Sequence, residues 1–251
     1  MQKKILSALV LCLTAVTAMA GELDDILDKH WEAQGGKKAL EAIKTMVIKG
    51  NMSITTPQGQ MDFPLKMTMK DGNKARFDAT LQGMDMVQCV NGESGWKIVP
   101  FMGSTDPEDM TDIELKEMKR RADFLGDLYN YKEKGNKVEL VGKADVEGTE
   151  TFHITSTDPD GKVTNHYIDT ENYILIKTQG KENQNGMEIE TETFYSDYKE
   201  VGDLMMAHAL TMKAQAGMAQ GMEMRYESVE VNSDVPDDVF KKPEPKEEKK
   251  Q

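Results

Sequence analysis

The sequence predicts a mainly β, α+β fold of about ten to eleven antiparallel strands, with one helix before the strands and one inserted among them. Two observations predict it. Long stretches alternate apolar and polar residues with a period of two, which is typical of strands with one wet face. Short segments rich in Gly, Asn, Asp and Pro separate these stretches, as hairpin turns do. A sheet of so many strands cannot stay open and flat, so we expect it to curl around an apolar cavity that the two helices cover.

The composition of the chain disfavours several functional classes. Its 251 residues include 31 basic and 44 acidic side chains, for a formal net charge of −13 at pH 7. Such an acidic balance disfavours binding to a nucleic-acid backbone, because that binding depends on Lys and Arg displacing counterions. Four His and two Cys leave little for a zinc cluster or a disulfide framework. The unusual feature is 19 Met against 7 Phe, 7 Tyr and 2 Trp, which any functional interpretation has to explain.

The first twenty residues have the features of a secretory signal peptide. Lys3 and Lys4 supply a positive start, residues 5–16 are apolar, and a small-x-small cleavage site ends at Ala20. The apolar run is shorter than the roughly 20 residues that a membrane-spanning anchor needs. Cys12 follows a leucine, where lipoprotein processing requires a small residue, so we do not expect acylation. We expect export, with cleavage after Ala20.

Cleavage would leave one folded domain and a short tail. Without residues 1–20, which include two lysines, the chain has 231 residues with 29 basic and 44 acidic side chains, a balance of −15. Cys89 would be its single cysteine, so we expect no internal disulfide and a small buried or half-buried side chain rather than a reactive thiol. We expect the domain to span residues 21–240, and residues 241–251 (KKPEPKEEKKQ) to form a disordered charged tail.

The N-terminal part of the domain begins with a helix and continues as a meander. An amphipathic helix is expected over residues 22–34, where apolar side chains recur at helical spacing, and Gly35-Gly36 ends it. A short helical turn is expected over residues 37–44. The period then changes to two, which predicts the following strands: residues 46–54, 61–69, 75–81, 84–90 and 95–99.

The second helix is expected between two series of strands. Thr105, followed by Pro107 and several acidic residues, has the features of a helix start, and the apolar spacing continues to about Leu128. Strands are expected to resume after it at residues 137–141, 150–157, 162–169, 173–178, 187–198, 204–213 and 221–231.

The sequence contains no recognisable catalytic site. It has no Gly-rich phosphate loop, no nucleophile elbow and no closely spaced pair of His residues. His30 lies on the apolar stripe of the first helix, where a buried, hydrogen-bonded His is the expected role, and the other three His lie on separate strands. Glu188, Glu190 and Glu192 share one strand face, which we interpret as solvated. The sequence therefore predicts a protein that is not an enzyme and holds no cofactor or resident metal.

The methionines allow three interpretations. Met-x-Met pairs recur on the apolar faces of three expected strands: Met67 and Met69, Met84 and Met86, and Met222 and Met224. Core packing explains part of the count, because Met fills irregular gaps. Leu, Ile and Val usually dominate strand interiors, so an adaptable cavity for lipid-like ligands explains more of it. Thioether sulfurs also bind Cu(I), although these pairs lie on separate strands with no His or Cys cluster nearby.

Several local segments are shared with one known family. They are Leu23-Asp24-Asp25-Ile26-Leu27 through Gly35-Gly36, Lys70-Asp71-Gly72-Asn73 leading into Arg76-Phe77, Asn91-Gly92 before Gly95-Trp96 and Pro100-Phe101, Phe194-Tyr195-Ser196-Asp197-Tyr198, and the ending from Val229-Glu230-Val231-Asn232 to Phe240. In these segments and in the order of its parts, the chain resembles the LolA/LolB-like periplasmic outer-membrane lipoprotein-sorting (carrier) family.

The resemblance implies an incomplete antiparallel β-barrel whose apolar interior, covered by helices, holds the acyl chains of a lipoprotein in transit. Because the chain lacks an acylatable Cys, it resembles the soluble carrier form of the family. That form uses a basic residue near the turn between its second and third strands to control the opening of the lid, which makes Lys70 and Arg76 the candidates here. The implied partners are lipoprotein or lipid acyl chains, an inner-membrane donor and an outer-membrane acceptor. We expect a monomer that binds no nucleic acid.

The expected ligand-binding residues occupy the inward positions of the strands: Met46, Ile48, Met52, Met61, Phe63, Leu65, Met67, Met69, Phe77, Met84, Met86, Met222 and Met224. The expected lid residues lie on the two helices: Leu23, Ile26, Leu27, Trp31, Met110, Ile113 and Met118. Three other functions stay open at this point, namely binding of a different hydrophobic ligand, Cu(I) transport, and an assembly role with a fully packed interior.

Overall fold

A computed structural model describes residues 21–57, 59–81, 83–100, 104–184, 187–214 and 221–245. The expected signal peptide with its cleavage site, most of the expected tail and Phe101 lie outside the described residues.

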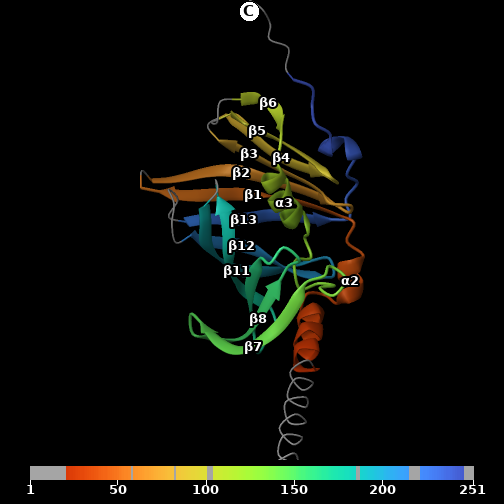
Figure 1. Ribbon diagram of the computed structural model, residues 1–251, viewed down its shortest axis with the longest axis vertical. Coiled ribbons are helices and arrows are strands. Elements are labelled where there is room, and N and C mark those ends of the chain that lie inside the picture. Colours follow the sequence, from red (N-terminus) through yellow and green to blue (C-terminus); the bar gives the residue numbers. More distant parts are fainter. Residues whose placement is uncertain are drawn as a thin grey trace, which may run out of the picture.

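The described strands form one antiparallel sheet, which leaves its two edges unpaired. The strands are β1 (Thr45–Thr56), β2 (Gly59–Lys70), β3 (Lys74–Leu81), β4 (Met84–Asn91), β5 (Ser94–Val99), β6 (Ser104–Asp109), β7 (Lys137–Val146), β8 (Thr149–Thr157), β9 (Val163–Asp169), β10 (Leu175–Gln184), β11 (Met187–Val201), β12 (Leu204–Ala214) and β13 (Gly221–Val231). Their order across the sheet is β6-β5-β4-β3-β2-β1-β13-β12-β11-β10-β9-β8-β7. The first and last strands therefore pair at the centre, while β6 and β7 lie at opposite edges (Figure 1). The prediction of a mainly β fold with an incomplete, curled antiparallel barrel is confirmed.

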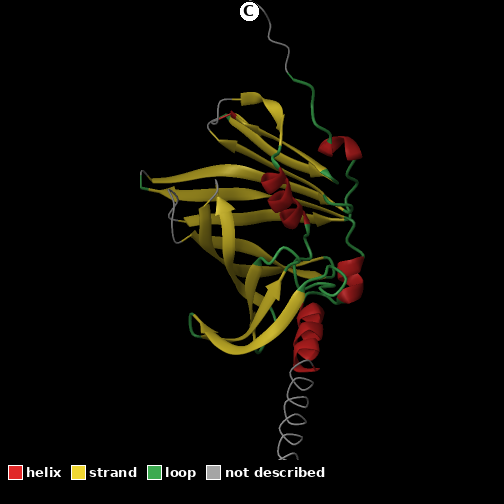
Figure 2. Ribbon diagram, in the orientation of Figure 1, coloured by secondary structure: helices red, strands yellow, loops and turns green. Residues whose placement is uncertain are grey.

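Few helices accompany this sheet (Figure 2). Residues 21–33 are helical, and three short helices follow within the described ranges: α2 (Lys37–Glu41), α3 (Asp112–Ala122) and the 3-10 helix η2 (Asp237–Phe240). Gly35 separates residues 21–33 from α2 with a φ of +111°, and a Cβ atom there would lie 2.1 Å from the carbonyl oxygen of Asp203. Only glycine fits this conformation and this close approach. The approach brings the end of the first helix against the turn between β11 and β12.

The second helix is shorter than predicted, and the number of strands is larger. The expected helix start at Thr105 is wrong, because Ser104–Asp109 form β6, giving a sheet of 13 strands rather than about ten to eleven. Pro107 is tolerated there because an edge strand does not need every N–H group. The helix begins at Asp112, where Thr111 and Glu114 form a capping box, and ends at Ala122 rather than near Leu128.

The connection from β6 to β7 has to cross the sheet, because these strands lie at its opposite edges. We call residues 110–136, which include α3, the crossing segment. Met118, Leu128 and Tyr129 of this segment are buried in the same cluster as Met46 and Met69. The face of the sheet that the crossing segment and helix 21–33 cover is the inner face.

A second, smaller cluster lies on the opposite, outer face. Cys89 of β4 and Trp96 of β5 pack there against Phe240 of η2, all three being buried. The C-terminal segment, residues 232–245, therefore covers β3–β5 from outside while the crossing segment covers them from inside. Among the described residues, no helix is long and apolar enough to cross a membrane.

Candidate functional site

Cross-strand pairing aligns the inner-face side chains in rows. Met46 of β1 pairs with Met69 of β2 on one side and with Val231 of β13 on the other. Further along β1, Met52 lies between Phe63 and Met224 in the same way. Residues directly opposite one another in antiparallel strands project from the same face. The rows therefore define which side chains line the interior.

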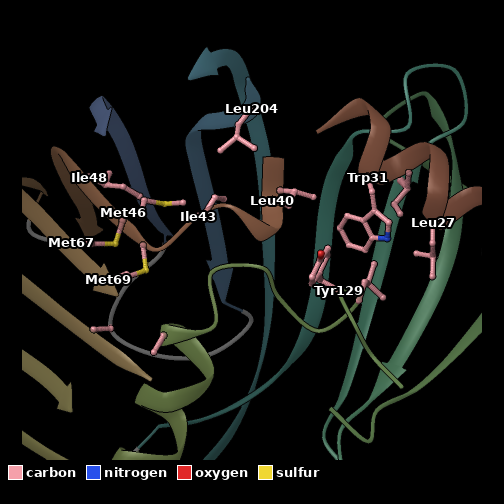
Figure 3. Close-up of a cluster of buried hydrophobic side chains, with 14 of the residues drawn as sticks. Leu27, Trp31, Leu40, Ile43, Met46, Ile48, Met67, Met69, Tyr129 and Leu204 are labelled. Atoms are coloured by element: carbon pink, nitrogen blue, oxygen red, sulfur yellow. The ribbon is translucent and has the colours of Figure 1, made fainter. Parts of the chain in front are cut away.

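All the expected ligand-binding residues share the inner face of β1–β4 and β13. The structure thus brings them together as one surface, but their binding of a ligand stays a prediction. Part of this surface is sealed. Met46 is 2% exposed and Met69 is 5% exposed, beneath Leu40, Ile43 and Leu204 (Figure 3). Ile48, Phe63, Leu65 and Met67 are buried as well.

The remaining part of the inner face is incompletely covered. Met84 is 37% exposed. The other members of this part are half-buried: Met52, Met61, Phe77, Met86, Met222 and Met224. Methionine side chains are flexible enough to pack against ligands of different shapes. The interior is therefore a continuous apolar surface with a closed part below the helices and an accessible part further along the same strands.

Helix 21–33 closes the first part through its apolar stripe. Leu23, Ile26, Leu27 and Trp31 are all buried in the inner cluster. The indole of Trp31 meets the ring of Tyr129 edge-on, with 5.3 Å between ring centroids, so the helix rests on the crossing segment (Figure 3). The expected lid residues of this helix therefore do face the interior, but their movement as a lid is untested.

The expected lid residues Met110, Ile113 and Met118 are buried to different extents. Met118 of α3 is 3% exposed within the inner cluster, and Met110 packs against that cluster while half-buried. Ile113 is 60% exposed and is not part of this interface. Below α3, Lys97 of β5 donates a hydrogen bond to Glu114. This polar contact adds to the apolar packing that holds α3 on the sheet.

Lys70 and Arg76 lie on the outer face, where they bind the C-terminal segment. The ammonium group of Lys70 donates to the carbonyl oxygen of Val235 at 2.8 Å and lies 2.8 Å from a carboxylate oxygen of Asp237. Arg76 Nη1 donates to the carbonyl oxygen of Val239 at 3.0 Å. The structure thus places both lid-control candidates opposite the expected lid. Any influence on the helices would have to pass through the sheet.

The same outer contact buries the cysteine. Trp96 Nε1 donates to the carbonyl oxygen of Phe240 at 3.0 Å, and Cys89 Sγ lies 3.3 Å from that oxygen. Burial raises the pKa of the Cys89 thiol to about 12. Because the thiolate is the reactive form, the folded protein keeps this group unreactive.

Buried histidines lie beneath the inner cover. His30 Nδ1 lies 2.7 Å from the carbonyl oxygen of Tyr173, in the turn between β9 and β10, and burial lowers the pKa of His30. His166 Nε2 lies 2.9 Å from Ser156 Oγ, which also donates to Asp127 at 3.3 Å. Burial lowers the pKa of His166 to about 4, although Asp127 opposes this effect. Both imidazoles are therefore neutral at pH 7, and their contacts are typical of structural histidines.

A polar cleft of about 490 Å³ adjoins the crossing segment but is separate from the apolar surface. Its basic groups are engaged with acidic neighbours; for example, Arg120 donates to Asp158 at 2.6 Å and Lys134 contacts Asp123. No group of three or more His, Cys, Asp or Glu side chains within the described ranges is arranged to hold a metal ion.

The expected ligand-binding residues did not include the part of the inner face that β11 and β12 form. Tyr195 pairs with Leu210, which pairs with Met224. Met212 pairs with Met222 in the next row. Tyr226 of β13 also packs against the inner cluster. The period of two was visible in the sequences of β11 and β12. Their position beside β1 was not, because it depends on β13 pairing with β1, a strand distant in the sequence.

Comparison with known proteins identifies the fold. No family model matches the sequence, and no curated protein matches it. A LolA superfamily protein from Nitrosomonas europaea superposes with a TM-score of 0.62 at 13% sequence identity, over 87% of this chain and 97% of that chain. A proposed outer membrane lipoprotein-sorting protein domain from Vibrio parahaemolyticus gives a TM-score of 0.57 at 10% identity, over 86% of this chain and 94% of that chain.

A protein of the DUF1329 family from Desulfovibrio piger is similar to the same extent. Its TM-score is 0.58 at 11% identity, over 87% of this chain and 96% of that chain. The predicted resemblance to the LolA-like lipoprotein-sorting proteins is therefore confirmed as a resemblance of the fold across almost the whole described chain.

Proposed function

We propose that this protein, which has the fold of LolA-like proteins, is a carrier that binds the acyl chains of lipids or lipoproteins on its apolar inner face. One observation carries the proposal. The inner face continues from a sealed core around Met46 and Met69 to half-buried methionines such as Met52 and Met224 without a change of face. An apolar ligand could therefore extend a surface that the protein already buries in part.

The energetics of acyl transfer suit this surface. Each buried CH₂ group contributes about 0.8 kcal/mol, so a chain of about fifteen CH₂ groups gains on the order of 10 kcal/mol on leaving water. This contribution is not directional, and a cluster of flexible thioether side chains can match chains of differing shape. We therefore assign the protein transport rather than catalysis.

The contacts of helix 21–33 suggest how a ligand could reach the sealed part. Its packing is apolar, and it has few polar attachments. His30 contacts the carbonyl oxygen of Tyr173, and the N–H of Met205 donates to the carbonyl oxygen of Gln34 just after the helix. An acyl chain could replace the apolar contacts of the helix with equivalent ones of its own. We propose that the helix and the crossing segment are displaced together, because Trp31 and Tyr129 pack against each other.

The finer proposal is that the carrier works in the periplasm and sorts lipoproteins to the outer membrane. It rests on the lipoprotein-sorting name of a structure with the same fold and on the signal-peptide features of residues 1–20. A mature charge of −15 would suit docking on basic surfaces of an inner-membrane donor and an outer-membrane acceptor.

Acyl binding can be tested by fluorescence titration with dansyl-undecanoic acid. Met52→Glu puts a charge on the inner face and should weaken binding at least about tenfold. Thr55→Glu is the matched control, because Thr55 lies on the same strand, is exposed and projects from the other face. Met52→Leu should bind like the wild type, and circular dichroism checks that each variant folds. Equal binding by all three variants would refute an inner-face site.

Cu(I) binding is a second candidate, and one observation favours it. Met52 pairs directly with Met224 and Met212 pairs with Met222, which brings four thioether side chains together on three neighbouring strands. Replacing Met222 and Met224 with Leu distinguishes the two functions. A lipid carrier would keep its acyl affinity, whereas a Cu(I) protein would lose its metal affinity.

A further inference from the structure

We propose that Tyr195 and Tyr226 recognise the ester carbonyl groups at the head of the bound acyl chains, so that the interior selects ester-linked lipids over plain hydrocarbon. This inference rests on the proposed acyl-binding function and specifies its ligand. The two phenols share the inner face with the methionines, their hydroxyl groups can donate hydrogen bonds, and the acyl linkage offers an acceptor.

The two tyrosines lie at the border between an apolar and a hydroxyl-bearing part of the inner face. One row runs through Tyr195, Leu210, Met224 and Met52 by direct cross-strand pairs. Tyr226 follows Met224 by two residues on β13 and therefore projects from the same face. Its packing against the inner cluster agrees with that assignment. Tyr226 thus adjoins Met224 along β13, and Tyr195 lies in the same row as Met224 with Leu210 between them.

Hydroxyl groups continue from Tyr195 across the neighbouring strands. Thr178 of β10 pairs with Thr193 of β11, which pairs with Met212. The hydroxyl oxygens of Thr178 and Tyr195 are 3.2 Å apart, and either can donate to the other. A hydroxyl that accepts a hydrogen bond from one partner can donate its own hydrogen to another. The row therefore places donors next to an apolar surface.

Tyr226 lies opposite a glycine, and its hydroxyl is an unused donor among the described residues. Its partner across the strands is Gly50, which has no side chain. A Cβ atom on Gly50 would lie 2.0 Å from the carbonyl oxygen of Arg225, so the glycine is required for the close approach of β1 and β13. No hydrogen bond joins the Tyr226 hydroxyl to any described residue. Burial raises the pKa of this phenol, and the nearby Tyr195 adds to the effect.

This arrangement suits an acceptor that lies at the end of an apolar chain. A neutral phenol donates one hydrogen bond, and a donor that a bound acyl chain shuts off from water is costly unless the ligand offers it an acceptor. An ester carbonyl accepts such a bond. The corresponding ether-linked lipid has no carbonyl group, and its ether oxygen is a weaker acceptor in a different position. A chain packed along Met52 and Met224 would bring its ester linkage to Tyr195 and Tyr226.

Two dansyl phosphatidylethanolamines test the proposal, one with two ester-linked chains and one with two ether-linked chains of equal length. We expect the wild-type protein to bind the diester about fivefold more tightly. Tyr226→Phe and Tyr195→Phe should each reduce this preference without weakening binding of the diether. Tyr167→Phe is the control. Tyr167 follows His166, an inner-face residue of β9, and therefore projects from the outer face, where its hydroxyl donates to Gln179.

The outcomes separate this inference from the proposed function. Equal affinity of the wild type for both lipids would overturn the role of the tyrosines while leaving acyl binding intact. An undiminished ester preference in Tyr226→Phe together with Tyr195→Phe would also overturn it. Failure of the wild type to bind either lipid would refute acyl binding itself, and the ester inference with it.

Discussion

The Nδ1 atom of His30 lies 2.7 Å from the backbone carbonyl oxygen of Tyr173, a residue 143 positions further along the chain. This contact ties the helix that covers the sealed part of the inner face to the turn between β9 and β10. The rings of Tyr173 and Phe152 stack beneath it, with 5.8 Å between centroids. The His30 contact is one of the few polar attachments of a helix whose interface is otherwise apolar; another joins Lys29 Nζ to the Tyr173 hydroxyl.

Acid should weaken the fold through the two buried histidines. The pKa of His30 is lowered by burial, and that of His166 is lowered to about 4. Between these folded values and the unfolded pKa of about 6.5, the unfolded chain binds more protons, so the free energy of unfolding rises with pH. We expect it to fall as the pH drops below about 6.5, with no such loss above that value.

Urea unfolding at about pH 7.5 and at about pH 5 measures this dependence. His166→Gln removes the titrating group but keeps a side chain that can bond to Ser156, so its unfolding free energy should depend less on pH. The titratable groups whose charges act on the pKa of His166 are Asp127, His30 and His153. If the variant shows the pH dependence of the wild type, His166 is not the source.

Methionine oxidation should follow the division of the inner face into a sealed and an accessible part. Brief treatment with hydrogen peroxide converts an accessible thioether to the sulfoxide and reduces the peroxide to water. Among the methionines whose exposure the structure describes, Met84, at 37%, should react first, and Met46, at 2%, should resist. Peptide mass mapping gives the extent at each site. Rapid oxidation of Met46 in the folded protein would show that the helices do not seal it.

Gly35→Ala should destabilise the fold by on the order of 2 kcal/mol. The added Cβ would meet the carbonyl oxygen of Asp203, which approaches to 2.1 Å of that position. Gly148→Ala controls for backbone strain, since Gly148 also has a positive φ, +90°, but open space around it. Urea unfolding should show the larger loss for Gly35→Ala. Equal losses would mean that conformation alone, and not the contact with the β11–β12 turn, requires Gly35.

Phe240→Ala should loosen the C-terminal segment and expose the thiol beneath it. Phe240 is fully buried against Cys89 and Trp96, so its truncation should cost about 3–5 kcal/mol. Labelling of Cys89 by a thiol reagent, mapped by peptide mass, should become faster. Trp96→Phe, which removes one hydrogen bond to the Phe240 carbonyl, should cost only about 1 kcal/mol. Unchanged labelling in Phe240→Ala would refute shielding by this segment.

Local periodicity was enough to predict most of the strands and the facing of their residues. The alternation that contains Met67 and Met69 predicted their inward position, and the structure pairs Met69 with Met46 on the inner face. The stripe containing Trp31 likewise predicted the buried side of the first helix. These features depend on neighbours within a few residues, which a sequence displays directly.

Features set by distant contacts could not be predicted in this way. Tyr226 lines the interior because β13 pairs with β1, a partnership that no local pattern records. Lys70 and Arg76 were candidates for lid control because the family resemblance gives that role to a basic residue near this turn, yet the C-terminal segment binds both from outside. Pro107 and its acidic neighbours suit a helix start, but pairing with β5 draws them into β6 instead.

Native mass spectrometry with a synthetic diacylated lipopeptide tests acyl carriage most directly. The full chain, purified without detergent, is incubated with the lipopeptide and, separately, with the same peptide lacking its acyl chains. We predict a dissociable one-to-one complex with the lipopeptide, none with the bare peptide, and loss of the complex in Met52→Glu but not in Thr55→Glu. Absence of a complex with the lipopeptide, or an equal complex with the bare peptide, would contradict acyl binding on the inner face.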